Sequence, residues 1–575
     1  MPTEKKLTGY PSIDKPWLKY FGEKKIDFDI HQTIYSNFKK VAESYKENLA
    51  LINFRNGQKL SFGELLVEAD AFAAGLATIG IKKRSKVVAL TFNSFIDSIA
   101  LLGANKIGAM IEFLDPESDV AKLKQHASDG DAWIVEGVFQ PLANLIRDDI
   151  PTIIYNCSKS FGHENNIPYS DFINNGKNSQ SAINHDENNP AVIIFSSGST
   201  GAPKPIVHSD FSVNCAIEKM LRSDFPLDHK HFMVKTIPSW IGLGVITSML
   251  VALMAGMPQV LLGSIENSTF DFATCEPNMI PRQMFSDTLT LMTTYSQWKT
   301  TNSLDYTVGI VFFSAPIFFK FLLSQEQAIS DMSFLKGILL GGSKMTEKEL
   351  DLMDEIFRIK GLSVPIGIGY GQNELGGAVA LNTVHHNKNG SAGYPVWKTV
   401  VKIVDRDTYE EVKYNEIGLI LEKSDSTFLY YDHMPEETAN TKIILSDGTQ
   451  WYNSNDLGYI DEDGFLFITG RINRVVIKSD HKVSMDVVEA KIKGIEGIRD
   501  AAVVPSANGR EDGDTIVFAV PENENMELSL ERINDTKHGL TVFETPAKLV
   551  IVEELPRMNN GKVDYKALEK EAEKL

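Results

Sequence analysis

The stretch "AVIIFSSGSTGAPKP", residues 191–205, places a loop rich in glycine and hydroxyl residues directly after an apolar run. The run "AVIIF" is typical of a buried strand. Gly198 and Gly201 allow positive φ and close backbone approach, so that amide groups can converge on an anion, and Lys204 adds positive charge. Further donors come from Ser196, Ser197, Ser199 and Thr200. The stretch therefore predicts a phosphate-binding loop after a strand, where α/β sheets bind ligands.

The order of residues in this loop excludes a phosphate loop of the Walker type. That motif is GxxxxGK[ST], in which the lysine directly follows the second glycine and a hydroxyl residue follows the lysine. Here alanine and proline separate Gly201 from Lys204, and Pro205 follows the lysine. A plain Gly/Ser turn would account for the composition but not easily for this order. The loop is thus expected to serve another phosphate chemistry.

The chain before the loop alternates short apolar runs with helical patterns. Residues 62–79 keep a helical period of apolar side chains, and a second helical stretch covers 95–106. Strand-like runs recur at 86–90, 108–114, 131–137, 151–156 and 191–196. This alternation predicts an α/β fold with a largely parallel, doubly wound sheet.

The pattern changes after about residue 390, where short strand-like runs are broken by Gly, Asp and Asn. They predict an antiparallel, barrel-like subdomain at about 390–470, with "DEDG" (461–464) as a hairpin turn. We expect a large domain over 1–470 and a small, mobile α+β domain over 471–575. In the small domain, Ser484 is the expected N-cap of a helix that starts at Met485, and the tail after Tyr565 is expected to be a solvated helix.

Composition limits the class of protein. The 575 residues are 43% hydrophobic and 23% charged, which is typical of a globular chain of several domains. The net charge of −19 argues against nucleic acid or an anionic membrane as the main partner. Three widely spaced cysteines fit a reducing compartment and give no thiolate zinc site. The N-terminus lacks an apolar signal region, and no apolar stretch reaches the ~20 residues of a membrane span. A cytoplasmic protein is expected.

The loop "SSGSTGAPKP" resembles the signature of the adenylate-forming superfamily, which includes acyl-CoA synthetases, nonribosomal-peptide adenylation domains and firefly-type luciferases. Other stretches resemble segments of that family in the family's order: "GGSK" (341–344), "YGQNE" (370–374), "GSAGYP" (390–395), "WYNSNDLGYIDEDGFLFITGR" (451–471) and "LPRMNNGKVDYKAL" (555–568). Matches in family order over residues 190–570 are hard to explain by coincidence. The chain is identified as a member, closest in type to acyl-CoA synthetases.

The resemblance implies a nucleotide site. It places Tyr370 near the adenine, Asp456 on the ribose hydroxyls and Arg471 beside the same nucleotide. The full set implied for ATP and AMP is Ser196, Ser197, Gly198, Ser199, Thr200, Gly201, Lys204, Gly341, Gly342, Tyr370, Gly371, Asn373, Asp456 and Arg471.

The resemblance also implies the catalytic groups. Glu374 would hold Mg²⁺, Lys204 would lie in the phosphate loop, and Lys562 would reach the reacting carboxylate and the α-phosphate. Attack of a carboxylate on the α-phosphorus of ATP brings anions together, so catalysis is mostly positioning and charge neutralisation. Family members rotate the small domain between their two steps, and the matching hinge position is Asn473, a polar residue that tolerates unusual φ and ψ.

Two departures from the family pattern concern the nucleotide and the acceptor. Asn373 stands where threonine is usual, and its amide can still donate to phosphate. In "KSDHKVS" (478–484), Asp480 or His481 replaces the glycine of a turn near the incoming thiol, while Lys482 matches its basic residue. His481 is either a base or, more simply, a solvated loop residue. This departure concerns the transfer to coenzyme A and not the adenylation step.

The third departure concerns the acid. Adenylation domains for α-amino acids place an aspartate in the pocket, but residues 238–256 contain no acid. An unpaired ammonium group in an apolar pocket is costly, which favours a fatty or other non-amino carboxylic acid. Trp240, Ile241 and Leu243 are candidates for the acyl pocket, with 312–319 close by; plain core packing is the alternative for each.

These observations predict an AMP-forming acid–thiol ligase that uses ATP and Mg²⁺ and passes the acyl group to coenzyme A. One alternative is transfer to the phosphopantetheine of a carrier protein. Another is a catalytically degenerate member that binds nucleotide without turnover, and a luciferase-like oxygenase is a distant third. A monomer or homodimer is the family expectation.

Overall fold

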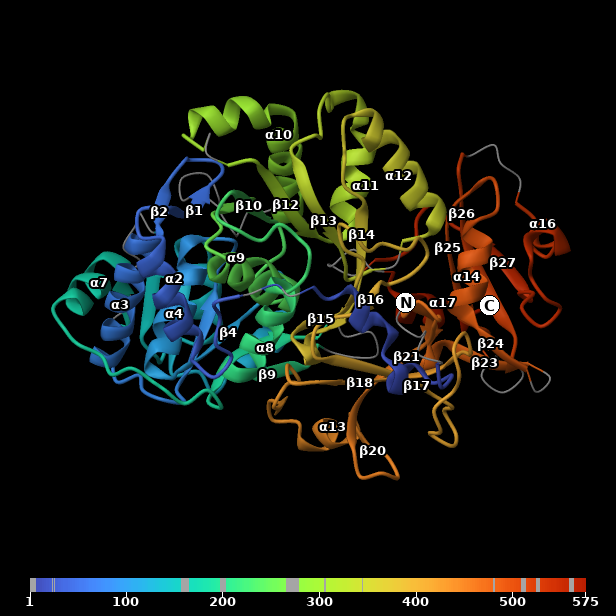
Figure 1. The fold of residues 1–575 in the computed structure, drawn as a ribbon, viewed down its shortest axis with the longest axis horizontal. Helices are drawn as coiled ribbons and strands as arrows, with labels where there is room; N and C mark the ends of the chain where they lie inside the picture. The colour runs from blue at the N-terminus through green and yellow to red at the C-terminus, as the bar shows by residue number, and fades with distance from the viewer. Residues whose placement is uncertain are drawn as a thin grey trace, which may run out of the picture.

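A computed structural model gives the fold (Figure 1). It describes residues 7–575 apart from 23, 25, 157–164, 197–202, 265–278, 305–306, 344, 479–480, 508–512, 524–527 and 558–562. Two large sheets, a five-stranded antiparallel sheet and a smaller C-terminal part make up the chain. Every described helix is too short or too polar to span a membrane.

The first large sheet has eight strands. In spatial order they are β19 (Tyr430–Tyr431), β9 (Pro205–Ser209), β8 (Pro190–Phe195), β4 (Met110–Phe113), β3 (Lys86–Leu90), β5 (Ala132–Glu136), β6 (Thr152–Tyr155) and β7 (Asn166–Pro168). The six from β8 to β7 are parallel, whereas β9 and β19 are antiparallel to their neighbours. The strands β3 and β5 are fully buried, which explains why their sequences are apolar apart from Lys86 at the start of β3 and Glu136 at the end of β5.

Helices cover this sheet. They are α2 (Ile34–Ser44), α3 (Phe62–Thr78), α4 (Phe95–Ile107), α5 (Val120–His126), α6 (Gln140–Ile146), α7 (Tyr169–Lys177) and α8 (Asp210–Leu221). The helix α3 starts with a capping box, because Ser61 Oγ accepts from the Glu64 amide while the Glu64 carboxylate accepts from the Ser61 amide. The helix predicted over 62–79 is confirmed, and it packs on α4 and α7.

The second large sheet has nine strands. In spatial order they are β16 (Tyr394–Pro395), β15 (Gly377–Leu381), β14 (Ile366–Gln372), β13 (Leu335–Leu340), β12 (Gly309–Ser314), β10 (His231–Lys235), β11 (Gln259–Leu261), β1 (Leu49–Asn53) and β2 (Lys59–Ser61). The run from β14 to β1 is parallel. The associated helices are α9 (Val251–Met254), α10 (Met279–Thr301), α11 (Pro316–Ser324) and α12 (Glu347–Ile359), together with a π-helix, Leu243–Leu250. The prediction of a doubly wound α/β fold is confirmed.

The predicted barrel-like part is a five-stranded sheet in which every described pairing is antiparallel. Its strands are β17 (Thr399–Val404), β18 (Gly418–Ser424), β21 (Gln450–Ile460), β20 (Lys442–Ile444) and β22 (Leu466–Arg471), with α13 (Pro435–Asn440) beside them. The strands β21 and β22 form a hairpin around the "DEDG" turn, as predicted.

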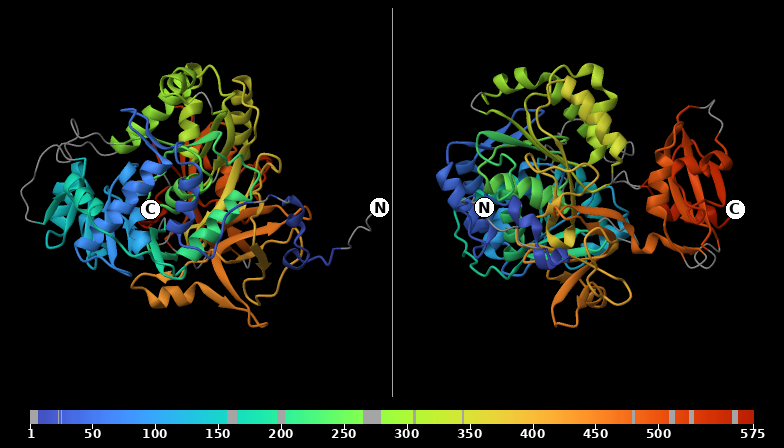
Figure 2. Two further views of the ribbon diagram at one scale, coloured as in Figure 1. Left: turned by 60° about the vertical axis from the view of Figure 1, so that its left-hand side comes forward. Right: turned by 45° about the vertical axis from the view of Figure 1, so that its right-hand side comes forward.

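Elements after Arg471 gather to one side of the rest of the chain (Figure 2). They are β23 (Val475–Lys478), β24 (His481–Ser484), α14 (Met485–Lys493), β25 (Ile498–Pro505), β26 (Thr515–Pro521), α16 (Leu530–Ile533), β27 (Lys548–Ile551) and α17 (Tyr565–Ala572). Ser484 is the N-cap residue of α14, as predicted, although its side chain makes no capping bond. One expectation here needs correction. The tail helix α17 is not simply solvated, because Leu568 and Ala572 are buried against the β25–β26 sheet.

Candidate active site

The candidate site lies where parallel strands of both large sheets end. At the end of β8 the Phe195 amide donates to the Trp240 carbonyl (3.1 Å), in the segment that follows β10. The ends of β12 and β13 are joined by a bond from the Gly341 amide to the Ser314 carbonyl (3.0 Å). The Ser314 and Thr236 hydroxyls are 2.9 Å apart. The ends of β8, β12 and β13 and the start of the segment after β10 are therefore connected, at the strand ends where α/β sheets bind ligands.

One end of the site is built around Asp456, which is 4% exposed on β21. The Tyr370 hydroxyl donates to Asp456 Oδ2 (2.7 Å) and Gln372 Nε2 donates to the same oxygen (3.3 Å). Arg471 Nε lies 3.1 Å from Asp456 Oδ1. Burial raises the pKa of the Asp456 carboxyl, and Arg471 and Tyr370 oppose that rise. The residues predicted for adenine and ribose thus form one connected cluster.

The other end contains Glu374, in the 3₁₀ turn Asn373–Leu375 after β14. Its side chain is buried, and the Tyr431 hydroxyl donates to Glu374 Oε1 (2.8 Å). Lys204 Nζ lies 5.0 Å from the centre of the Tyr431 ring. Burial raises the pKa of Glu374, whereas the Tyr431 bond and the charges of Lys204 and Arg471 lower it. A single buried carboxylate fits Mg²⁺, which is commonly held by one or two carboxylates together with substrate phosphates.

The predicted phosphate loop is closed at its base. The Ser196 amide donates to the Lys204 carbonyl (3.0 Å), and the Lys204 amide donates to Ser196 Oγ (2.9 Å). The predicted residues between them (Ser197, Gly198, Ser199, Thr200 and Gly201) lie outside the described residues. Lys562 and Asp480 also lie outside them.

Asn373 has a structural contact that the sequence did not suggest. Its Nδ2 donates to the Phe195 carbonyl (2.6 Å), which joins the ends of β14 and β8. The buried His208 ring lies with Nε2 2.7 Å from the Asn373 carbonyl, and burial lowers the pKa of His208 to about 4, so the ring is neutral. These bonds fix the turn that carries Glu374.

The expected acyl-pocket residues lie next to this turn. Trp240, Ile241 and Leu243 are half-buried, and the Trp240 ring packs against Phe92 at 5.7 Å. Between them, Gly242 approaches Asn373 so closely that a Cβ atom there would lie 2.7 Å from Asn373 Oδ1. An apolar segment is therefore held directly beside the candidate metal ligand.

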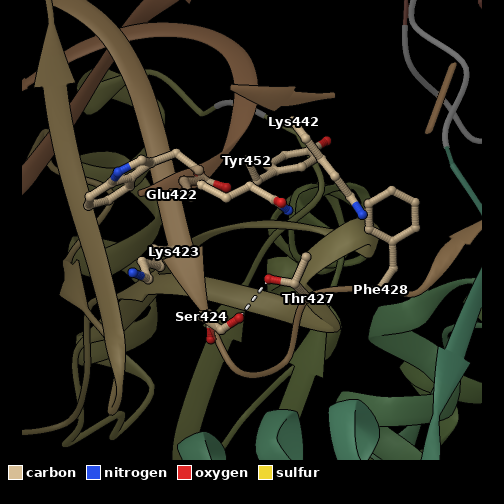
Figure 3. A pocket seen from close by; sticks show the side chains of 9 residues that line it. Glu422, Lys423, Ser424, Thr427, Phe428, Lys442 and Tyr452 are labelled. Carbon is tan, nitrogen blue, oxygen red and sulfur yellow. Dashed lines mark hydrogen bonds between the residues drawn. The ribbon is translucent and has the colours of Figure 1, made fainter. Parts of the chain in front are cut away.

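Three residues of the site were missed by sequence reasoning: Tyr431, Gln372 and Glu422. Glu422 on β18 is fully buried and pairs across the sheet with Tyr452, whose hydroxyl donates to Gln372 Oε1 (2.8 Å). Figure 3 shows Glu422 and Tyr452 side by side at a pocket of about 220 Å³. Burial and the charge of Asp456 raise the pKa of Glu422 well above its usual range. Its sequence signal was a lone acid in the apolar run "GLILEK".

A second group of possible metal ligands lies beside Tyr431. Asp129, Asp432 and His433 have donor atoms close enough together to share an ion. However, Lys86 Nζ lies 2.7 Å from both Asp129 Oδ1 and Asp432 Oδ2. An ammonium group is already ion-paired with both carboxylates, so the cluster serves to anchor the chain beside Tyr431.

The remaining predicted residues have simple surroundings. Gly342 adopts a left-handed φ of 87°, and Gly371 packs so tightly that a Cβ atom would lie 2.0 Å from the Gly377 carbonyl oxygen.

The candidate hinge residue Asn473 is exposed in the 3₁₀ turn Ile472–Arg474. His481 is exposed and its ring stacks on Phe543 with centres 3.7 Å apart. Lys482 lies on β24, paired with Ile477 of β23.

Known proteins resemble this chain over most of its length. Residues 38–431 match the family model described as AMP-binding enzyme. The chain is 26% identical to the putative acyl-CoA ligase YdaB of Bacillus subtilis (strain 168), over 86% of this chain and 90% of that protein. It is 23% identical to the 4-coumarate–CoA ligase of Pinus taeda, over 94% of this chain and 95% of that one.

Among solved structures, the fold is similar to that of the anthranilate CoA ligase AuaEII in complex with anthranoyl-AMP. The TM-score is 0.77 at 18% identity, and the match covers 95% of this chain and 98% of that one. At this identity the likeness shows a shared fold.

Proposed function

Because the chain belongs to the AMP-binding enzyme family, we propose that it is an AMP-forming acid–thiol ligase. In the first step a carboxylate oxygen attacks the α-phosphorus of ATP and the bond to the β-phosphate breaks, giving an acyl-adenylate and pyrophosphate. In the second step a thiolate attacks the acyl carbon and AMP leaves. We propose coenzyme A as the thiol, which is supported by the names of the relatives that are CoA ligases.

The observation that carries the proposal is the position of two buried carboxylates around the end of β14: Glu374 follows the strand directly, and Asp456 accepts hydrogen bonds from Tyr370 and Gln372 on it. Asp456 is surrounded by hydrogen-bond donors suited to a nucleoside, whereas Glu374 lies near Lys204 as a ligand suited to a metal–phosphate group. Arg471 contacts Asp456 and its charge also acts on Glu374. This arrangement can hold a nucleoside and neutralise its phosphates together.

Roles follow for the individual residues. We assign Tyr370, Asp456 and Arg471 to the nucleoside, the 196–204 loop to the β- and γ-phosphates, and Lys562 to the reacting carboxylate and α-phosphate. Glu374 would hold Mg²⁺, which supplies Lewis-acid stabilisation of charge on the phosphates. The chain would divide into domains at 1–470 and 471–575, with Asn473 as the hinge.

The acid is proposed to have an apolar body and no α-ammonium group. The segment 238–256 contains no acid to pair with an ammonium, and Trp240 and Phe92 offer an apolar wall beside Asn373. Burying an unpaired ammonium against such a wall is costly.

Acid-dependent exchange of pyrophosphate into ATP, screened over fatty, aryl and amino acids, tests the first step. Lys562→Ala is expected to lower exchange by about 10²–10³, the usual cost of one preorganised electrostatic group. Lys566→Ala, at an exposed lysine on α17, is the matched control. ATP binding without exchange for any acid would contradict the proposal. Product mass spectrometry with CoA or a carrier protein then identifies the acceptor.

A further inference from the structure

The chain on either side of Lys562 is drawn together by backbone contacts. Arg557 and Val563, which flank the undescribed residues 558–562, form an antiparallel β-bridge. The Asp564 amide donates to the Pro556 carbonyl (2.8 Å). The two ends of the segment that carries Lys562 are thus fixed to one another.

The end of the segment at Tyr565 is attached to Arg474, the residue that follows the candidate hinge residue Asn473. The Tyr565 hydroxyl donates to the Glu489 carboxylate, at 2.9 Å from Oε1 and 3.1 Å from Oε2. Arg474 Nη2 donates to Glu489 Oε2 (3.0 Å), and the Arg474 guanidinium lies 3.7 Å from the centre of the Tyr565 ring. Arg474 directly follows Asn473. The start of α17 and the hinge turn are therefore bound to the same carboxylate.

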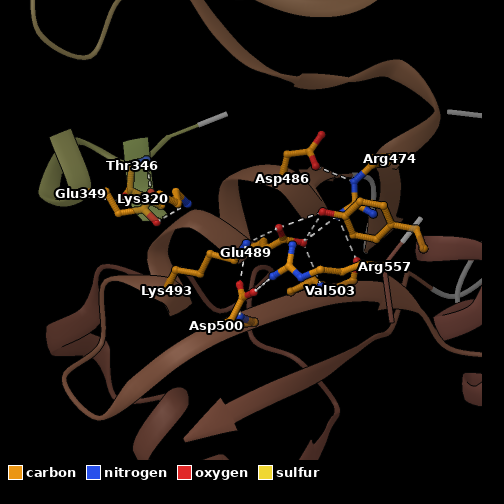
Figure 4. Close-up of polar contacts among 12 residues, drawn as sticks. Lys320, Thr346, Glu349, Arg474, Asp486, Glu489, Lys493, Asp500, Val503 and Arg557 are labelled. Carbon is orange, nitrogen blue, oxygen red and sulfur yellow. Dashed lines mark hydrogen bonds and ion pairs between the residues drawn. The ribbon is translucent and has the colours of Figure 1, made fainter. Parts of the chain in front are cut away.

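The other end joins the same network through ion pairs. Arg557 Nη2 lies 2.5 Å from Asp500 Oδ2, and Lys493 Nζ lies 3.1 Å from both Asp500 Oδ1 and Glu489 Oε1. Figure 4 shows Glu489 between Arg474 and the Lys493–Asp500 pair. Both ends of the Lys562 segment consequently connect to Glu489.

Burial indicates which part of the network is strong. Arg474 and Glu489 are 9% and 7% exposed, so removing one partner leaves a buried, uncompensated charge. The Arg557 side chain is 48% exposed, and its pair with Asp500 is correspondingly screened. Burial and the Glu489 charge raise the pKa of Tyr565, which keeps its hydroxyl protonated as a donor.

We propose that Glu489, Arg474 and Tyr565 are positioning residues for Lys562, which fasten the base of its segment to the hinge turn. The described residues on either side of the segment, Arg557 and Tyr565, would then move together with the hinge turn. The inference rests on the proposed function, in which Lys562 acts in adenylation. Loosening the attachment should therefore impair adenylation more than thiol transfer.

Tyr565→Phe tests this inference, because it removes the hydroxyl but keeps a ring over Arg474. We expect acid-dependent pyrophosphate exchange to fall roughly tenfold, the scale of one lost hydrogen bond to a charged group. Thioester formation from presynthesised acyl-adenylate and CoA should stay within about twofold, which a general loss of structure would not allow. Lys491→Met is the matched control. Lys491 lies on α14, the helix that carries Glu489, but it pairs with Glu544 (2.7 Å).

Two results would overturn the inference: unchanged exchange in Tyr565→Phe, or equal losses in both half-reactions. Asp500→Asn, on the more exposed side, should give a smaller loss confined to exchange and provides a second variant. The Lys562→Ala enzyme separates the two proposals. If it retains exchange, the role of Lys562 in the proposed function fails; if it loses exchange while Tyr565→Phe does not, only the positioning role fails.

Discussion

The two buried carboxylates of the site differ in how the protein surrounds them. Asp456 receives hydrogen bonds from Tyr370 and Gln372 and forms an ion pair with Arg471. Among the described residues, the Glu374 side chain accepts one side-chain hydrogen bond, from Tyr431, and Lys204 lies over the Tyr431 ring. The protein thus neutralises Asp456 directly, as suits neutral ribose hydroxyls. The positive charges that act on Glu374, those of Lys204 and Arg471, act without a described ion pair to its carboxylate. The carboxylate therefore keeps a negative charge suited to a divalent cation.

The largest expected effect is at Glu374. Glu374→Gln keeps the shape but removes the charge that would hold Mg²⁺, so exchange should fall by about 10²–10³. Titration of Mg²⁺ against exchange rate is the measurement, and a raised Mg²⁺ requirement is the expected signature. Activity within threefold of the parent, at an unchanged Mg²⁺ requirement, would remove Glu374 as the metal ligand.

A smaller effect of a different kind is expected at Asp456. Asp456→Asn leaves Arg471 beside a neutral amide and weakens the acceptor for ribose, so the KM for ATP should rise about tenfold or more. The Mg²⁺ requirement should stay as in the parent. If the variant instead changed the Mg²⁺ requirement, the assignment of Asp456 to the ribose and of Glu374 to Mg²⁺ would be wrong.

The smallest effect is expected for Tyr431→Phe, about three- to tenfold in exchange at neutral pH. The Tyr431 bond lowers the pKa of Glu374, which burial raises, so removing the bond raises that pKa further. Because Mg²⁺ needs the ionised carboxylate, the acid side of the pH–rate profile should move to higher pH. A profile that stayed in place, or moved to lower pH, would contradict the contact.

Sequence reasoning named candidates that lie in continuous motifs and missed Tyr431 and Glu422, which tertiary pairing supplies. It also missed Gln372, although that residue lies within the quoted stretch 370–374. Glu374 and Asp456 stand in stretches that resemble family segments. Tyr431 reaches Glu374 because β19 pairs with β9 across a long separation in sequence, and Glu422 faces Tyr452 through the β18–β21 register. Neither register is readable from local pattern.

The C-terminal helix α17 was predicted to be solvated, and this error has a different cause. Leu568 and Ala572 are spaced i, i+4, which is one face of a helix, and the structure buries both. This spacing can be read from the sequence, but most of the residues around Leu568 and Ala572 are charged, and the tail was therefore predicted to be solvated. The roles of Lys562 and of the 197–201 loop, outside the described residues, stay predictions.

Gly242 limits how the acid specificity of this chain can change. Its neighbours Trp240, Ile241 and Leu243 are half-buried, so replacing them can reshape the wall of the pocket. Any side chain at 242 would instead meet Asn373 Oδ1, 2.7 Å from the new Cβ, and press on the side chain whose Nδ2 donates to the Phe195 carbonyl. Variant libraries aimed at new acids should therefore vary 240, 241 and 243 and keep glycine at 242, where a substitution would disturb the bond that joins the ends of β14 and β8.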